Sequence, residues 1–269
     1  MNRKLLFFDI DGTLLAGGIP GYIPESTIQA LKAAQANGHY IFINSGRTYS
    51  FMPKLVRDFP FDGYICGCGT EVILHGETIF HHEIPKELQL HMKDVLKESR
   101  IQGVFEGHSA CYYNYEETFL PPLAHIYESY TKIEMKDAAR SFDDPELDFD
   151  KFVIITDENS DLERFLQLTE KDFQLMGAPK QRPYGFGEIV PKECSKASGI
   201  DIVVEHLGLS LDDCYVFGDA PNDLSMLRHV KNSVAMGNAF PEILGETSYV
   251  TTPVDRDGIY VALKHFHLI

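Results

Sequence analysis

The sequence has few cysteines, few basic residues relative to acidic ones, and no long apolar run. The five cysteines are scattered, and the one close pair, Cys66 and Cys68, fits neither a disulfide framework nor a zinc-binding spacing. The longest apolar runs are fragments such as Leu5–Phe8, far short of the roughly 18 residues that a membrane span requires. Asp9 and Asp11 also interrupt the apolar stretch after the basic start, which excludes a signal peptide. We therefore expect a reduced, cytoplasmic protein.

The charge balance limits the classes of partner. The chain has 24 basic and 40 acidic residues, and its formal net charge is −16. Such a surface repels nucleic-acid phosphates and anionic lipids, so we expect no nucleic-acid partner and no membrane partner. A small phosphorylated substrate remains compatible, because a local cluster of donors or a bound cation can reverse the field inside a cleft. The sequence does not indicate whether any protein partner exists.

Short apolar strands alternate with amphipathic helices near both ends of the chain. The predicted strands are 4–8, 40–43, 214–217, 233–236 and 249–251, and the predicted helices include 24–38, 195–207 and 258–266. Strand–helix–strand alternation is typical of a parallel sheet with helices on its faces. We therefore predict an α/β fold whose core is a doubly wound, Rossmann-like parallel sheet.

The middle of the chain has a different pattern. The predicted elements are helices at 86–99 and 162–169, strands at 152–155 and 173–176, and an aromatic segment at 111–115. About 100 residues suffice for a small domain, and the elements after it resume the pattern of the first part. We predict that residues 83–186 form an inserted α/β cap domain and that residues 1–82 and 187–269 form the core.

Two carboxylates end the first predicted strand, in the motif Asp9-Ile10-Asp11-Gly12-Thr13. Residues i and i+2 of an extended chain face the same side, so both carboxylates can address one site. Unpaired charge at the end of a buried strand is costly to desolvate. This cost favours a functional site over the alternative, which is a solvated Asp-Gly turn.

A second acidic motif, Gly218-Asp219-x-x-Asn222-Asp223, follows another apolar strand. Acidic groups at two strand ends suit Mg²⁺, which typically takes one or two carboxylates and keeps several waters. A helix N-cap formed by Asn222 or Asp223 would explain the second motif equally well, and the two interpretations are compatible.

Ser45, Gly46 and Arg47 follow the second predicted strand. A hydroxyl and backbone N–H groups at the start of a helix form an anion-binding corner. An ordinary helix cap would also explain Ser45, and Arg47 could equally be a charge on the helix face. Lys196, at the start of a later helix, would by itself be a solvated charge.

The order of these motifs resembles that of the haloacid dehalogenase-like hydrolase superfamily. Val234–Ala239 and Asp257–Ile259 resemble the closing region of its Cof-type phosphatases, and the inserted segment is similar to the cap of that subgroup. The sequence departs from the subgroup at one turn, where Cys68-Gly69-Thr70 stands in place of the usual Asn-Gly-Ala. This departure indicates a divergent substrate pocket.

The resemblance implies a Mg²⁺-dependent phosphomonoester hydrolase that forms an aspartyl-phosphate. Asp9 would be the nucleophile, Asp11 the general acid and base, and Thr13 would orient Asp9. The implied metal-site residues are Asp9, the Asp11 carbonyl and Asp219, with Asn222 and Asp223 behind them. The groups implied for the phosphate are Ser45, the Gly46 N–H, Lys196 and, as an open choice, Arg47. A phosphomutase and a catalytically retired phospho-ligand binding module are the alternative functions.

The resemblance also implies that the inserted domain selects the leaving group. Its hydroxyls, imidazole and carboxylates suit hydroxyl-rich ligands, so we predict a preference for small sugar phosphates, although nucleotides and cofactor phosphates are also compatible with a cap of this size. The candidate residues are Glu106, His108, Tyr112, Tyr115, Lys180, Arg182 and Tyr184. Lys180 and Arg182 could hold a second anionic group.

Overall fold

A computed structural model describes residues 3–18, 21–131 and 136–269. They divide into two compact units, each described by itself. The first unit comprises Met1–Gly46, Leu55–Phe80 and Ser195–Ile269, and the second comprises Arg47–Lys54 and His81–Cys194. No helix in the described part of the chain has the length and apolar character needed to cross a membrane.

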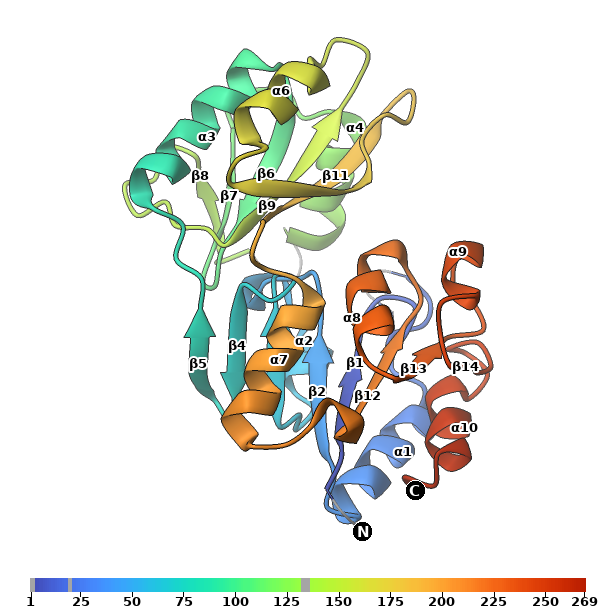
Figure 1. Ribbon diagram of the computed structural model, residues 1–269. Coiled ribbons are helices and arrows are strands. Elements are labelled where there is room, and N and C mark those ends of the chain that lie inside the picture. Colours follow the sequence, from blue (N-terminus) through green and yellow to red (C-terminus); the bar gives the residue numbers. More distant parts are fainter. Residues whose placement is uncertain (1–2, 19–20, 132–135) are drawn as a thin grey trace. The chain divides into compact units, whose positions relative to one another are not determined.

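An eight-stranded sheet forms the centre of the first unit, in the order β14-β13-β12-β1-β2-β3-β4-β5 (Figure 1). Its strands are β1 (Leu5–Phe8), β2 (Tyr40–Asn44), β3 (Gly63–Cys66), β4 (Glu71–Leu74), β5 (Glu77–His81), β12 (Cys214–Gly218), β13 (Asn232–Ala235) and β14 (Tyr249–Val250). The pairs from β14 to β3 are parallel, and β3 and β4 are antiparallel. Because the later strands are added on both sides of β1, the sheet is doubly wound, and the predicted fold class is confirmed.

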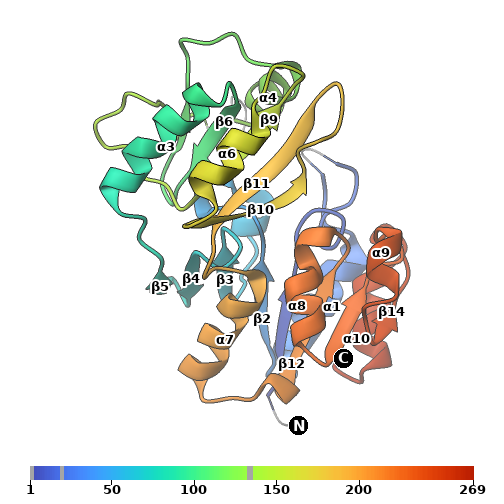
Figure 2. The ribbon, with the colours of Figure 1, turned by 45° about the horizontal axis from the view of Figure 1, so that its top comes forward.

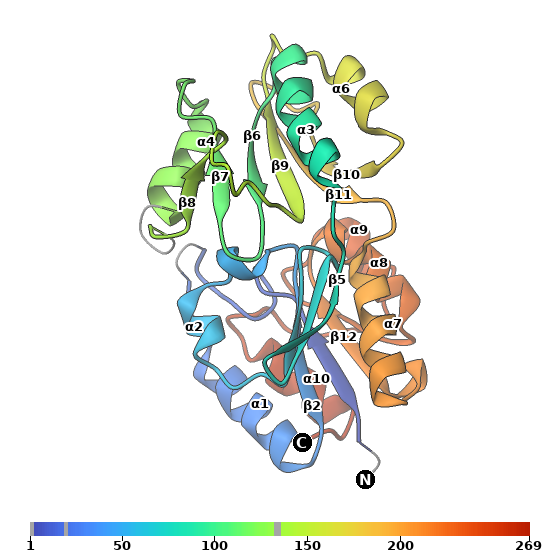
Figure 3. The ribbon, with the colours of Figure 1, turned by 90° about the vertical axis from the view of Figure 1, so that its left-hand side faces the viewer.

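Helices cover both faces of this sheet. The helical segments after β1 and β2 and in the last part of the chain are α1 (Glu25–Ala36), α2 (Lys54–Arg57), α7 (Lys196–Leu207), η3 (Leu211–Asp213), η4 (Pro221–Asp223), α8 (Leu224–His229), α9 (Pro241–Leu244) and α10 (Gly258–His265). Figure 3 places α1 and α7 on opposite sides of the strands. Leu5 and Phe7 of β1 pack in one apolar core with Ile200 and Val203 of α7. The hydrophobic spacing of α7 therefore fixes its orientation on the sheet.

A six-stranded sheet forms the second unit, in the order β10-β11-β9-β6-β7-β8. The strands and helices of this unit are η1 (Tyr49–Phe51), α3 (Lys86–Glu98), β6 (Gln102–Glu106), β7 (Cys111–Tyr113), α4 (Pro121–Ile126), η2 (Tyr127–Thr131), β8 (Ala139–Ser141), β9 (Lys151–Thr156), α6 (Leu162–Thr169), β10 (Phe173–Ala178) and β11 (Gly185–Pro191). Its neighbouring strands are antiparallel, except that β7 and β8 are parallel. Figure 2 shows β10 and β11 side by side.

Both faces of the second sheet are also buried. Phe105 and Phe152 pack on one face, in an apolar core that includes residues of α3 and α6. Val104 and Val153, one position along each strand, pack on the other face with residues of α4. Figure 3 shows α3 and α6 on one side of the strands and α4 on the other. The alternation of side chains along each strand produces the two cores.

The second unit is larger than the predicted segment 83–186. Strand β11 continues to Pro191 and pairs with β9 and β10, so it crosses the predicted boundary after residue 186. Arg47–Lys54 also belongs to this unit: Phe51 packs in its core, and Ser50 Oγ donates a hydrogen bond to the Gly107 carbonyl at 2.7 Å. The pattern did not predict this assignment, because the segment directly follows the end of β2.

Candidate active site

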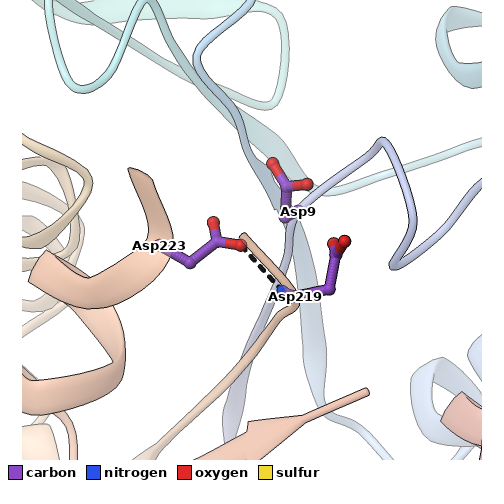
Figure 4. A group of neighbouring side chains, drawn as sticks. All are labelled: Asp9, Asp219 and Asp223. Carbon is purple, nitrogen blue, oxygen red and sulfur yellow. Dashed lines mark hydrogen bonds between the residues drawn. The ribbon is translucent and has the colours of Figure 1, made fainter. Parts of the chain in front are cut away.

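Three aspartates meet at the carboxyl ends of β1 and β12 in the first unit (Figure 4). Asp9 follows β1, and Asp219 and Asp223 follow β12. All three are buried, and one carboxylate oxygen from each lies within 4.8 Å of the others. Because β1 and β12 are adjacent parallel strands, their carboxyl ends meet at one edge of the sheet.

Lys196 joins two of these carboxylates. Its Nζ donates to Asp9 Oδ1 at 2.6 Å and to Asp223 Oδ1 at 2.5 Å, and its side chain is 0% exposed. Lys196 is the first residue of α7, and a capping box fixes this helix start: Ser195 and Ser198 exchange hydrogen bonds between side chain and backbone. The lysine is therefore a buried ion-pair partner and not the solvated charge that its position alone suggested.

The cluster holds more negative than positive charge. Burial raises the pKa of Asp9 well above its usual range, although the attraction of Lys196 opposes the shift. Burial also raises the pKa of Asp219 to about 7, against the hydrogen bond from Thr13 and with a contribution from Asp223. Burial lowers the pKa of Lys196, but the two carboxylates outweigh this effect and the net shift is upward. An additional cation would therefore favour the ionised carboxylates.

Asp223 holds the turn that carries Asp219. Its Oδ2 accepts the Asp219 N–H at 2.8 Å, drawn as a dashed line in Figure 4, and the Ala220 N–H at 3.0 Å. With Lys196 on Oδ1, both carboxylate oxygens accept donors of the chain. Asp223 directly precedes α8, but its side chain makes no cap hydrogen bond to that helix and instead accepts from the turn before it. Asn222 Oδ1 is buried and has no hydrogen-bond partner in the described structure.

Thr13 orients Asp219 and not Asp9, so this part of the sequence prediction is wrong. Thr13 Oγ1 donates to Asp219 Oδ1 at 2.8 Å. Gly12 brings the turn close to the same carboxylate: its φ is +85°, and a Cβ there would lie 2.3 Å from Asp219 Oδ2. This close approach requires glycine. Asp11 is exposed on the turn, and its charge contributes to the raised pKa of Asp9.

Ser45 and Gly46 are buried after the end of β2. The prediction that a helix begins at Ser45 is wrong: the chain enters the short turn η1, whose N-cap is Thr48. Pro53 follows extended Met52 and separates this turn from α2. Ser45 and Gly46 are thus on a connecting segment at the edge of the sheet where Asp9 lies.

Cys68 replaces the usual asparagine next to these residues. It is fully buried, and its φ of 57° lies in the left-handed region, where asparagine is more common. Its N–H donates to the Ser45 carbonyl at 3.0 Å, and its charge contributes to the raised pKa of Lys196. The thiol therefore lies near the Lys196 ammonium, where the subgroup would have an amide.

Asn44 is a site residue that the sequence analysis missed. Its Nδ2 donates to the Lys196 carbonyl at 3.0 Å and ties the end of β2 to the first turn of α7. The side chain is buried. Its position in the sequence could have indicated this role, because Asn44 is a polar residue that ends an apolar strand directly before Ser45.

Arg47 is the first residue of the Arg47–Lys54 segment of the second unit. Its Nη1 donates to the Phe51 carbonyl at 3.2 Å, and its charge lowers the pKa of Glu106, against the larger effect of burial. His108 lies nearby, with its ring stacked on Tyr49 at 5.1 Å between centroids. The segment after Gly46 is therefore bound to the β6–β7 turn.

The leaving-group candidates divide between the two ends of the second sheet. Glu106 and His108 are at one end, and Lys180 and Arg182 are in the β10–β11 turn at the other. The register pairs Glu106 with the first residue of β9 and Gly185 with its last. Five steps along a strand correspond to roughly 16 Å. The two sets of candidates therefore lie at opposite ends of the sheet, and which of them contact a substrate stays a prediction.

The three candidate tyrosines also differ in position. Tyr112 is part of the apolar core, 4% exposed, and its hydroxyl donates to the Glu146 carbonyl at 3.1 Å, so it does not face a cleft. Tyr115 is 47% exposed and packs against other aromatic rings after β7. Tyr184 is half-buried in the same turn as Lys180.

Glu106 belongs to a buried ion triad that sequence analysis did not find. Lys151 Nζ lies 3.0 Å from Glu106 Oε2 and 2.6 Å from Glu188 Oε1. Burial raises the pKa of Glu106, although Lys151 opposes the shift. Lys151 begins a strand and gave no signal in the sequence.

Comparison with known proteins places the chain in a family. A family model described as haloacid dehalogenase-like hydrolase matches residues 6–263. The chain is 30% identical over 274 residues to YkrA of Bacillus subtilis (strain 168), which carries a provisional phosphatase designation, with both chains covered completely. It is 29% identical to the HMP-PP phosphatase of Klebsiella pneumoniae (strain 342), over 98% of this chain and 94% of that relative.

Solved structures show the same fold. The sugar phosphatase BT4131, of subclass IIB of this superfamily, is 31% identical with a TM-score of 0.78, over 99% of this chain and all of that one. A structure from work on a trigonal-bipyramidal intermediate in a phosphoryl-transfer superfamily is 30% identical with a TM-score of 0.81, over 99% of this chain and all of that one. The chain therefore belongs to the haloacid dehalogenase-like hydrolases, in the Cof-type group, and is a phosphatase.

Proposed function

We propose that the protein hydrolyses phosphomonoesters of small metabolites through an aspartyl-phosphate on Asp9, with Mg²⁺ as its cofactor. The observation that carries this proposal is the buried contact of Asp9 with Lys196. Lys196 Nζ donates a hydrogen bond to Asp9 Oδ1 at 2.6 Å, and its charge opposes the rise in the pKa of Asp9 that burial causes. Because Oδ1 is held by this bond, we propose Oδ2 as the oxygen that attacks phosphorus.

Asp11 supplies the proton transfers in this mechanism. In the first step, Asp9 Oδ2 bonds to phosphorus, the bond to the leaving oxygen breaks, and Asp11 gives that oxygen its proton. In the second step, Asp11 takes a proton from a water whose oxygen attacks phosphorus, and the bond to Asp9 breaks. Inorganic phosphate and the original Asp9 carboxylate are the result. The exposed position of Asp11 supports this role, because its carboxyl group has to exchange a proton first with the leaving group and then with a water molecule.

The phosphoryl oxygens need positive or donor groups, which the edge of the first sheet offers. We assign this role to Ser45, the Gly46 N–H and Lys196. Phosphoryl transfer depends mainly on such positioning and charge stabilisation. The lysine is already held in the buried cluster by two carboxylates, so its direction is set before the substrate binds.

The residues present fit a divalent cation. The cluster has three carboxylates, of which Lys196 pairs with two, and Asn222 has a buried oxygen without a partner in the described structure. We assign Asp9, the Asp11 carbonyl and Asp219 as ligands, with Asn222 and Asp223 behind them, because both Asp223 oxygens already accept donors of the chain. A bound Mg²⁺ would neutralise charge on the phosphoryl group.

Mg²⁺ should raise the melting temperature of the wild-type protein. A hundredfold excess of the ion over its Kd contributes about 2.7 kcal/mol, which corresponds to a shift of about 5 °C or more in Tm. Asp219→Asn should lose most of this shift, because it removes a proposed ligand from the cluster. Asp213→Asn is the matched control: Asp213 precedes the same strand at its other end and pairs with Lys4. An equal shift in wild type and Asp219→Asn, measured by differential scanning calorimetry, would contradict the metal assignment.

We further propose that the second unit selects the leaving group and that sugar phosphates are the preferred substrates. The core residues bind the phosphoryl group, which all phosphomonoesters share, so discrimination has to come from elsewhere. The likeness to a sugar phosphatase supports this substrate class, and the HMP-PP phosphatase relatives make phosphorylated heterocycles a second class to assay. Within the second unit, we favour the end that holds Glu106 and His108, because Arg47 and Tyr49, which follow Gly46 in the sequence, interact with these two residues.

His108→Ala should lower kcat/KM for the best sugar phosphate about tenfold, the value of one polar contact, and leave an aryl phosphate within about twofold. Arg182→Ala should change neither substrate much, because it lies at the opposite end of the sheet. Steady-state kinetics of both variants on both substrates provide the measurement. A sugar-specific loss in Arg182→Ala with none in His108→Ala would place the specificity at the β10–β11 turn instead.

The test of the proposed function is a turnover screen against phosphomonoesters with Mg²⁺, with inorganic phosphate and phosphorylated products both measured. Phosphate release would support the hydrolase. Transfer of the phosphoryl group to another sugar hydroxyl would identify a phosphomutase, and binding without turnover would identify a retired binding module. The presence of Asp9, Asp11, Lys196 and Asp219 favours the hydrolase over the last alternative.

We also propose a cytoplasmic location and a small-molecule ligand, with no nucleic acid or membrane as partner. The net charge of −16 supports the exclusion of polyanions. The five cysteines, all within the described residues, are buried and form no disulfide, which suits a reducing compartment.

A further inference from the structure

Asn238 links two loops at the active-site edge of the first sheet. It follows β13, in the segment after Met236. Its Nδ2 donates to the Gly12 carbonyl at 2.8 Å, and its Oδ1 accepts the Val254 N–H at 2.8 Å. Neither the proposed mechanism nor the metal assignment uses this side chain.

The Gly12 carbonyl, which accepts the hydrogen bond from Asn238, lies between two functional residues of the sequence. Gly12 stands between Asp11, the proposed general acid, and Thr13, which orients Asp219. The Cα of Gly12 packs closely against the Asp219 carboxylate, since a Cβ at this position would clash with it. The turn therefore has little room to move toward Asp219. Asn238 therefore fixes the peptide that joins two functional residues.

The same segment is bound to the turn of the second acidic motif. The Met236 N–H donates to the Gly218 carbonyl at 3.0 Å, and the Phe240 N–H donates to the Asp219 carbonyl at 2.9 Å. These backbone bonds hold the segment against β12 whatever residue is at position 238. The side chain of Asn238 then adds the connection to the turn after β1.

We propose that Asn238 is a positioning residue that acts through the Gly12 carbonyl to hold Asp11 in place for proton transfer to the leaving group. This inference rests on the proposed function, since it requires Asp11 to be the general acid. The reason is geometric: a general acid has to lie within hydrogen-bond reach of the leaving oxygen, and a small displacement lowers the rate strongly.

The experiment compares two substrates with different needs for protonation. An alkyl phosphate has a poor leaving group that needs the acid, whereas p-nitrophenyl phosphate has a good leaving group that hardly does. Asn238→Ala should lower the rate of the first step, the phosphoryl transfer to Asp9 measured in a single turnover, about tenfold or more on the alkyl phosphate. On the aryl phosphate the rate of this step should fall less than about threefold. The second step is common to both substrates and is therefore not used for the comparison. Asn238→Asp should show the same selectivity, because it keeps an acceptor for Val254 but loses the donor to Gly12.

Asn232→Ala is the matched control. Asn232 is at the other end of β13, and its Nδ2 donates to the carbonyl of Cys214, the first residue of β12, at 3.0 Å, so it also makes a side-chain hydrogen bond to a backbone carbonyl. It should leave the ratio of the two rates at the wild-type value. Thermal unfolding of each variant separates a loss of folded protein from a loss of positioning.

Asp11→Asn separates failure of the inference from failure of the proposed function. If Asp11→Asn loses the alkyl phosphate selectively and Asn238→Ala lowers both substrates equally, Asn238 is only structural and the inference is overturned. If Asp11→Asn itself lowers both substrates equally, the assignment of Asp11 is wrong and the inference falls with it.

Discussion

Asp9→Asn should abolish turnover, with a loss of at least about 10⁴ in kcat, the scale seen when a nucleophile of a catalytic unit is removed. The amide cannot form the proposed aspartyl-phosphate and loses the negative charge that Lys196 pairs with at 2.6 Å. Addition of a chelator to the wild-type enzyme should give a comparable loss, because Asp9 is proposed both as nucleophile and as ligand. Release of inorganic phosphate from an aryl phosphate and from the best sugar phosphate provides the measurement.

The folded state should survive this substitution. Burial raises the pKa of Asp9, so without a cation its ionised form is less favourable in the folded protein than in the unfolded chain. A raised pKa of an acid means that its charge lowers stability at pH values above the unfolded pKa. The melting temperature of Asp9→Asn in the absence of Mg²⁺ should thus equal or exceed that of wild type. Wild-type turnover in this variant, or turnover that a chelator does not affect, would contradict the aspartyl-phosphate mechanism.

The positions of the acidic motifs could be predicted because parallel strands impose them. Asp9 and Asp219 each follow a buried apolar strand, and β1 and β12 are parallel neighbours, so strand ends that are distant in sequence meet. The helix start at Lys196 was predicted within one residue, since Ser195 is a strong N-cap. What the pattern could not give is the partner of each side chain: Thr13 donates to Asp219, although Asp9 is nearer in the sequence.

In the second unit, the sequence predicted part of the secondary structure but not how far apart the candidate residues lie. The helices and strands that were predicted there lie close to their observed bounds, for example α3 at Lys86–Glu98 against the predicted 86–99, but β6, β8, β11 and α4 were not predicted. The sequence did not indicate how far apart the candidates for substrate binding lie, because single strands do not reveal which of their ends meet in an antiparallel sheet. The register of β9 and β11 separates Arg182 from His108. Arg47 was likewise assigned from its neighbours in the sequence, whereas it belongs to the second unit and donates to the Phe51 carbonyl there.

Asp11→Asn should slow hydrolysis by about 10²–10⁴, the usual contribution of general acid–base catalysis. The loss should be largest for alkyl phosphates, which need a proton on the leaving oxygen. It should persist for substrates with good leaving groups, because the second step still needs a base for water. Rapid mixing with substrate would measure the two steps separately. The rate at which the leaving group is released reports the first step, and the rate at which the phosphorylated enzyme loses its phosphate reports the second.

Mg²⁺ binding should be nearly unchanged in this variant, because only the Asp11 carbonyl is assigned to the ion and asparagine retains it. The Mg²⁺-dependent shift in Tm should therefore match that of wild type within about 1 °C. Asp219→Asn serves as the contrasting variant, since it removes a carboxylate ligand from the buried cluster. If Asp11→Asn instead lost the Tm shift and regained its full rate at saturating Mg²⁺, the side chain would be a ligand and not the acid. The different exposure of the two residues favours an unchanged Tm shift in Asp11→Asn. Asp11 is exposed on the Gly12 turn, whereas Asp219 is buried and held by Thr13.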